Sequence, residues 1–173
     1  RIHSRRRLLH LGIDSTARVA SAPIIIQKNA LNDIYFGSSV DGTIAALSEI
    51  LGPPDYISPP SLGGSDSCVD AEQVTWSGFT VVFAPSPSSG ALQFAGWQNH
   101  SFIAFPDLPI QTRDGRKVGI PWAQTSPQPT VTNDEYLGIY LEWPDGVWAV
   151  GDTDGTISLM RGGDETCLGA LYD

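Results

Sequence analysis

The segment Phe36–Asp55, FGSSVDGTIAALSEILGPPD, constrains the fold most, because it predicts a single short amphipathic helix in a chain otherwise rich in turns. Apolar residues recur along it at helical spacing and form one stripe, at Val40, Ile44, Leu47 and Leu51. A helix of this length is marginal in isolation. The stripe therefore predicts a helix over about residues 38–51 that packs on an apolar surface.

Both ends of this helix have sequence signals. Ser38 is the predicted N-cap, and Asp41 follows three residues later, near the positive end of the helix dipole. Gly52 stands where helices commonly end, and Pro53 after it prevents continuation. These signals predict a helix that both starts and stops within this segment.

The residues that follow predict the surface beneath the helix. QVTWSGFTVVFA reads as two strands joined by a turn at Ser77–Gly78, and ALQFAGW adds a third strand with Leu92, Phe94 and Trp97. The 18 glycines and 13 prolines of the chain suit a β-rich fold with many turns better than a helical bundle. The first half is thus predicted to be a helix followed by a three-strand meander.

The second half repeats this pattern in part. Three further strands are predicted, at about 138–143, 147–151 and 156–160. A matching helix would fall at about 120–133, but Pro127 and Pro129 would break its interior, so at most one turn survives after Pro121. Two similar units, the second without its helix, is the interpretation we favour; coincidence between short hairpins is the alternative.

Together these patterns predict an α+β fold: an antiparallel sheet built from two three-strand meanders, with one helix packed on it. Residues 1–20 form a basic N-terminal arm, and residues 21–173 form a single domain of two units, at about 35–110 and 111–167. The run Ile24–Ile26 is β-prone and reads as an edge strand or a packed lead-in.

Charge is unevenly distributed. Residues 1–20 hold five arginines and one aspartate, a formal charge of +4, whereas the remainder holds 5 basic and 18 acidic residues, a charge of −13. An acidic body repels phosphates, so nucleic acid is not an expected partner. We expect Arg5, Arg6 and Arg7 to dock on an acidic protein surface, such as a neighbouring copy, or on anionic lipid head groups; a solvated tail is the alternative.

The two cysteines, Cys68 and Cys167, lie in polar, glycine-rich surroundings and lack zinc-ligand spacing. An even pair in such a setting is typical of a secreted protein with one disulfide. We therefore predict a Cys68–Cys167 disulfide and an extracellular or cell-envelope location; two free thiols is the alternative. No apolar run is long enough to span a bilayer.

A search for reactive side chains finds no catalytic constellation. His100 is the only histidine outside the arm, and no G-x-S-x-G elbow is present. Acid pairs such as Asp134/Glu135 and Asp152/Asp154 are explained as turn residues, and GDTDGTIS departs from the calcium-loop spacing. No phosphate loop or dinucleotide fingerprint occurs, so no cofactor and no metal is expected.

The chain has five tryptophans, and two of them are candidates for a binding surface. Trp97 and Trp122 flank the Asn-His and proline-rich segments, which suggests exposure, whereas core packing is the alternative for each. Exposed tryptophan is frequent in protein interfaces. We therefore predict Trp97 and Trp122 as partner-binding residues, or as sugar-binding ones.

The motifs YFGSSVDGTIAALSEILGPPD, VTWSGFTVVFA, FAGW and TRDGRKVG, with a cysteine between the first two, resemble a group of uncharacterised actinobacterial exported or envelope proteins. The resemblance covers about residues 35–119 together with Cys167, and it implies export but no activity. The order of elements is also similar to the tandem helix-plus-sheet repeats of the β-lactamase inhibitor protein. That likeness concerns architecture alone and implies no β-lactamase target.

The functional expectation is a non-catalytic, exported interaction or structural module, of which an accessory subunit of a cell-envelope assembly is one form. Such a module would form homo- or hetero-oligomers through its basic arm. A carbohydrate- or small-ligand-binding domain is the first alternative, and a hydrolase built on His100 or on paired acids is the second.

Overall fold

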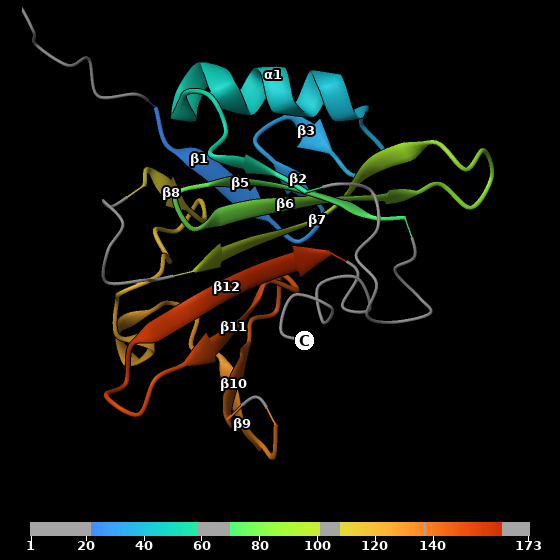
Figure 1. The fold of residues 1–173 in the computed structure, drawn as a ribbon. Coiled ribbons are helices and arrows are strands. Elements are labelled where there is room, and N and C mark those ends of the chain that lie inside the picture. The colour runs from blue at the N-terminus through green and yellow to red at the C-terminus, as the bar shows by residue number, and fades with distance from the viewer. Residues whose placement is uncertain (1–21, 59–69, 101–107, 137, 164–173) are drawn as a thin grey trace, which may run out of the picture.

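Two β-sheets and one α-helix make up the part of the chain that the computed structural model describes, residues 22–58, 70–100, 108–136 and 138–163 (Figure 1). The larger sheet has eight strands, in the spatial order β4 (Tyr56–Ile57), β5 (Glu72–Trp76), β6 (Phe79–Pro85), β7 (Leu92–His100), β12 (Ile157–Gly163), β11 (Trp148–Gly151), β10 (Gly138–Glu142) and β9 (Thr130–Asp134). The smaller sheet has four, in the order β3 (Ile34–Tyr35), β2 (Ala30–Leu31), β1 (Ile24–Gln27) and β8 (Ile110–Gln111).

Both predicted meanders are present in the larger sheet. Strands β5, β6 and β7 pair in sequence, as do β10, β11 and β12, and all of these pairs are antiparallel. The meanders join where their last strands meet, because β7 pairs with β12 from Gly96–Gly163 to His100–Leu159. Each meander thus runs from the outside of the sheet to its centre, which gives the sheet an approximately two-fold arrangement.

The prediction of a single sheet is wrong. The run Ile24–Ile26 lies in β1, which is an inner strand of the separate smaller sheet and not an edge strand: it pairs with β2 on one side and, in parallel, with β8 on the other. The physical reason is that β2, β3 and β8 have only two residues each. Strands that short show no period-two pattern in the sequence, so the partners of β1 were not visible.

Helix α1 (Val40–Leu51) confirms the predicted helix and lies across one side of the sheets (Figure 1). Its N-cap is Ser39 and not Ser38: the Ser39 hydroxyl accepts a hydrogen bond from the backbone N–H of Gly42, at 3.3 Å. Gly52 ends the helix with φ of 84°, a conformation that favours glycine. Leu47 is fully buried, and the indole of Trp76 donates to the Gly52 carbonyl oxygen at 2.9 Å, so the sheet holds the helix at its C-terminal end.

The described residues of the second unit form no α-helix, as the prolines predicted. One turn of 3-10 helix, η1 (Trp122–Gln124), follows Pro121, and the chain then enters β9 at the edge of the sheet. Strand β9 was not predicted from sequence. Its five residues are all exposed, so it lacks the alternation of apolar and polar residues by which a half-buried strand is recognised.

The hydrophobic core lies between the two sheets and under α1. Its largest fully buried side chains are aromatic or branched: Trp76, Trp97, Trp143, Phe79, Phe83, Phe94, Ile24, Ile26, Leu31, Leu47, Ile110 and Leu141. They come from both meanders, the helix and the smaller sheet, so the described parts share one core.

Candidate functional site

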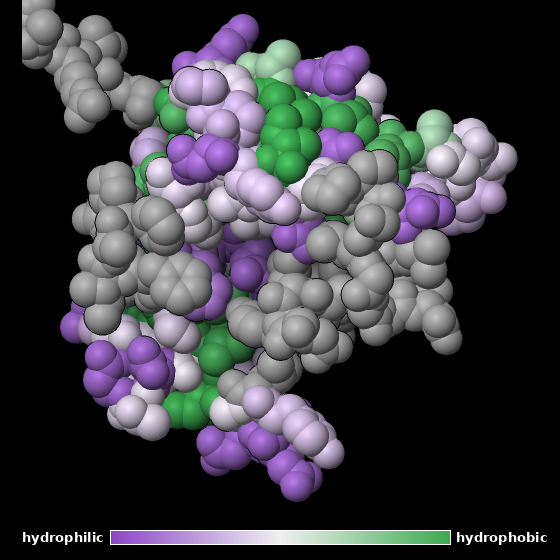
Figure 2. Space-filling view, viewed as in Figure 1, coloured by the Kyte–Doolittle hydropathy of each residue, from purple (hydrophilic) through white to green (hydrophobic). Residues whose placement is uncertain are grey.

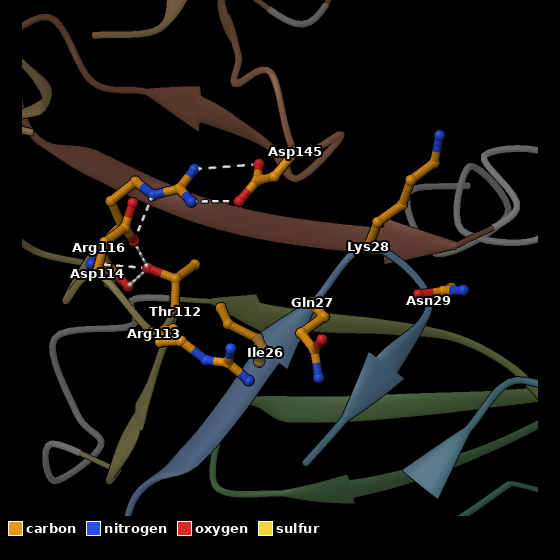
Figure 3. A pocket seen from close by; sticks show the side chains of 9 residues that line it. All are labelled: Ile26, Gln27, Lys28, Asn29, Thr112, Arg113, Asp114, Arg116 and Asp145. Atoms are coloured by element: carbon orange, nitrogen blue, oxygen red, sulfur yellow. Dashed lines mark hydrogen bonds and ion pairs between the residues drawn. The ribbon is translucent and has the colours of Figure 1, made fainter. Parts of the chain in front are cut away.

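A cavity of about 420 Å³ lies where three turns meet (Figure 3). The turns are the β1–β2 turn at residues 28–29, the turn at residues 112–116, and the β10–β11 turn that contains Asp145. All lining residues but Ile26 are of polar or charged types: Ile26, Gln27, Lys28, Asn29, Thr112, Arg113, Asp114, Arg116 and Asp145. The site therefore joins the smaller sheet to the second meander.

The turn at residues 112–116 is fixed by its own hydrogen bonds. The backbone N–H of Thr112 donates to the carbonyl oxygen of Arg116 at 2.8 Å, and the backbone N–H of Arg116 donates to the Thr112 hydroxyl at 2.8 Å. Gly115 has φ of 86°, which the turn requires at that position. These bonds hold the backbone from which the side chains of Arg113, Asp114 and Arg116 extend to line the cavity.

Arg116 is the buried centre of the site. Its Nε donates to Asp114 Oδ1 at 2.9 Å, and its Nη1 and Nη2 donate to the two carboxylate oxygens of Asp145 (Figure 3). The guanidinium also stacks on the indole of Trp143, with Cζ 5.0 Å from the ring centroid. The Arg116 side chain is only 5% exposed, and both of its ion pairs are therefore largely shielded from water. The pair with Asp145 links the 112–116 turn to the β10–β11 turn.

The titration of the pair follows from these contacts. Burial by itself raises the pKa of the Asp114 carboxyl, but hydrogen bonds from Arg116 and Thr112 outweigh it, so this pKa lies below its ordinary value. Burial alone would lower the pKa of Arg116, and the hydrogen bonds to Asp145 and Asp114 raise it instead. Arg116 and Asp114 are therefore both charged at neutral pH.

Two further cations line the cavity without such partners. Within the described part of the chain, neither Lys28 nor Arg113 forms an ion pair. Figure 3 shows Arg113 reaching from its turn toward Ile26 and Gln27, while Lys28 extends on the opposite side. The Lys28 stem packs on the β10–β11 turn, since a Cβ at Gly146 would lie 2.6 Å from its Cδ.

Positive charge is concentrated at this place. Only five basic residues occur after position 20, and four of them are Lys28, Arg113, Arg116 and Lys117. The cavity lining contains three cations against two carboxylates, although the chain from residue 21 onward has a formal charge of −13. An anion would thus be attracted here and repelled over most of the remaining surface.

A second, smaller hollow adjoins the first. It has a volume of about 350 Å³, shares Lys28 and Asn29 with the first cavity, and is otherwise lined mainly by apolar groups of Phe36, Phe94 and Ala95. The Phe36 and Phe94 rings pack edge to face with centroids 4.8 Å apart. The β1–β2 turn therefore lines both cavities, of which the first has more charged side chains.

The structure corrects one predicted site residue and qualifies another. Trp97 is not exposed: its side chain is 0% exposed in the core, and its indole donates to the Gln27 carbonyl oxygen at 2.8 Å. The reason is that β7 continues three residues beyond Trp97 and pairs there with the central strand β12. Trp122 is half-buried, with its ring against the backbone of Gly151, where a Cβ would lie 2.6 Å from Cζ3.

The other predicted site residues lie outside the described ranges. These are Arg5, Arg6 and Arg7 of the arm, and Cys68 and Cys167 of the proposed disulfide. Their positions relative to the cavity are therefore not described.

The candidate acids lie in two different turns, and His100 is the last residue of β7. Asp154 sits in the β11–β12 turn and accepts hydrogen bonds from the backbone N–H and the hydroxyl of Thr156, at 2.9 and 2.6 Å. Asp134 accepts from the backbone N–H of Tyr136 at 2.8 Å in the β9–β10 turn. No group of three or more metal-ligating side chains is found in the part of the chain that is described.

A second candidate binding surface is the β9–β10 hairpin, at the bottom of the view in Figures 1 and 2. All five residues of β9 are exposed, Val131 to 51%, and Tyr136 near the tip is 91% exposed. The outer side of β9 pairs with no strand among the described residues. The hairpin therefore offers an open sheet edge with two exposed hydrophobic side chains.

Sequence reasoning missed the cavity, although signals for it existed. Four cations cluster in two short segments of an acidic body, and TRDGRKVG contains an Asp-Gly turn signal. What could not be read from sequence is that residues 28, 113 and 145 meet, because they are far apart in the chain.

No family model matches this chain, and neither a curated protein nor a solved structure matches it significantly. The resemblance to actinobacterial exported proteins therefore stays a prediction. No described helix has the length and apolar character needed to cross a membrane.

Proposed function

We propose that this chain is a non-catalytic interaction module of an exported protein, and that it serves as an accessory subunit of a cell-envelope assembly. The observation that carries the proposal is strand β9, which is the longer of the two edge strands of the larger sheet in the described structure and exposes all five of its residues.

An exposed sheet edge favours pairing with another chain. Its outward backbone N–H and C=O groups are a template for a further strand, and proteins that avoid such pairing usually place lysine, proline or a bulge there. Strand β9, Thr130–Asp134, has no lysine, proline or bulge, and its single charged side chain, Asp134, stands at its last position; its pairing with β10 is regular over all five residues. Addition of a strand from a partner would satisfy these groups, with Val131 and Tyr136 providing apolar contact.

The basic arm is the second element of the proposal. Residues 1–20 have a charge of +4 and the rest of the chain −13, so the arm suits an acidic surface such as the body of a neighbouring copy. Arg5, Arg6 and Arg7 are the proposed contact residues. A Cys68–Cys167 disulfide and an envelope location belong to the same proposal and are supported by composition and by the resemblance.

The test is the native mass of the full chain over a range of concentrations, before and after reduction. We expect an assembly larger than one chain. Thr132→Lys, which places a charge in the middle of the edge strand, should return the mass to that of a single chain, whereas Thr153→Lys in the exposed β11–β12 turn should not.

A deletion of residues 1–20 separates the two contact elements. If the arm carries the association, the deletion abolishes it and leaves the fold intact. A single chain at every concentration, or identical masses for the two lysine variants, would contradict a role of β9.

The cavity favours a second candidate function, small-ligand binding. It contains the cations Lys28 and Arg113, and the structure gives neither of them an ion pair among the described residues.

A further inference from the structure

We propose that the cavity beside Arg113 binds a small anionic molecule through a carboxylate or phosphate group. This inference rests on the second candidate function, small-ligand binding, and names its ligand class; it depends on neither β9 nor the basic arm. It rests on the side chains that line the cavity and on their charges.

The first step concerns the acids of the lining. Asp114 and Asp145 would repel an anion if they were free, but both accept hydrogen bonds from the buried guanidinium of Arg116. Their charge is directed toward Arg116 and reduced by it. The repulsion that they exert on a ligand is correspondingly weaker.

The second step concerns the cations that remain. Arg113 and Lys28 are exposed, and the ion pairs of the described structure involve neither. The planar guanidinium of Arg113 can donate two parallel hydrogen bonds to one carboxylate or phosphate, while the ammonium of Lys28 acts as a point charge. In Figure 3 Arg113 is directed toward Ile26 and Gln27, whereas the Lys28 side chain points away from them, so the Arg113 guanidinium is the proposed contact and Lys28 adds positive potential at the rim.

The third step concerns the size and the remaining chemistry of the site. A volume of about 420 Å³ is in the range of small-molecule cavities. The buried side chain of Ile26 contributes an apolar surface, and the Asn29 amide can donate and accept hydrogen bonds. The Gln27 amide already donates to the Asn32 carbonyl oxygen at 3.1 Å, so its orientation is fixed.

A small molecule fits these observations better than a nucleic acid. The cationic region is limited to one cavity of an otherwise acidic body, and a long polyanion would extend from it over negative surface. A molecule confined to the cavity avoids that repulsion.

The experiment is a titration of the ¹⁵N-labelled full chain, followed by NMR, with inorganic phosphate and with citrate as separate probes. Sodium chloride at matched ionic strength is the reference for non-specific screening. We expect saturable shifts of the backbone amides of residues 27–29 and 113–116. Saturation by phosphate alone supports a phosphate ligand, by citrate alone a carboxylate ligand, and by both a general oxyanion site.

Two variants make the test specific. Arg113→Gln should weaken binding at least about tenfold, because it removes charge-assisted hydrogen bonds to the anion. Lys117→Gln removes the same charge from an exposed residue outside the lining, and it should change the affinity less than about twofold. The proposal would be overturned if neither phosphate nor citrate gave saturable shifts, or if the two variants weakened binding equally. Neither result would affect the proposal that β9 mediates association.

Discussion

Strands β5–β7 and β10–β12 form two meanders of the same order in one sheet, yet they are covered in different ways. The first is covered by α1 and the smaller sheet, with Leu47 fully buried. The second has in place of a helix the proline-rich segment 121–129, where the Trp143 indole donates to the carbonyl oxygen of Pro127 at 3.2 Å and Arg116 stacks on its ring.

This difference shows what replaces a helix when the sequence excludes one. In the first unit an apolar stripe supplies the cover. In the second unit the cover consists of half-buried Trp122 and of Arg116, which stacks on Trp143 and pairs with two carboxylates. Strand β9 remains as an exposed edge. The open edge is therefore a feature of the unit without a helix, and the cationic cavity lies between that unit and the β1–β2 turn of the smaller sheet. Three changes test this comparison.

The largest effect is expected for Leu47→Ala. It leaves a cavity under α1 at a fully buried position and should lower the free energy of unfolding by about 3 kcal/mol, as measured by urea denaturation. Glu49→Gln on the exposed face of the same helix is the control and should change it by less than about 0.5 kcal/mol. Trp122→Ala, at a half-buried position, should lower the free energy of unfolding by less than Leu47→Ala does. A larger decrease would mean that the proline-rich segment stabilises the sheet more than α1 does.

An intermediate effect is expected for Arg116→Gln. It removes the charge shared by Asp114 and Asp145 and should lower the free energy of unfolding by about 2 kcal/mol at pH 7. Arg113→Gln is the matched control, since Arg113 has no ion pair among the described residues, and its effect should be small.

The pH dependence of this effect has a defined sign. Because the pKa of Asp114 in the folded chain lies below its ordinary value of 3.8, the stabilisation is present above that value and is lost as the pH falls through the folded pKa. The stability difference between the wild type and Arg116→Gln should therefore narrow below about pH 4. A difference that stays constant down to pH 2 would show that the ion pair with Asp114 does not contribute.

The smallest effect is expected at the N-terminus of α1. Ser39→Ala removes the hydroxyl that accepts from the Gly42 N–H and should cost about 1 kcal/mol, measured by thermal or urea unfolding. Ser38→Ala, one residue earlier, should cost clearly less. The reverse order would restore Ser38 as the cap.

Local patterns explain which elements were predictable. The helix, its end at Gly52, the two meanders and the single turn after Pro121 were all visible, because helical spacing, period-two alternation and proline geometry act within a few residues. Strand β9 and the two-residue strands were not, because an exposed or very short strand has no hydrophobic pattern.

The candidate site was less predictable than the fold. The clustering of Lys28 with Arg113, Arg116 and Lys117 requires the smaller sheet to meet the second meander, and that meeting depends on the pairing of β1 with β8, whose strands are more than 80 residues apart in the chain. The burial of Trp97 likewise depends on the pairing of β7 with β12.

Propensity, periodicity and composition are local properties, and they specify the class of elements, their order and the uneven charge of the chain. Contacts between distant segments decide instead that there are two sheets, that Trp97 is core, and that Arg116 pairs with two acids beside two cations without ion pairs among the described residues. These depend on contacts between distant segments, whose geometry no local pattern encodes.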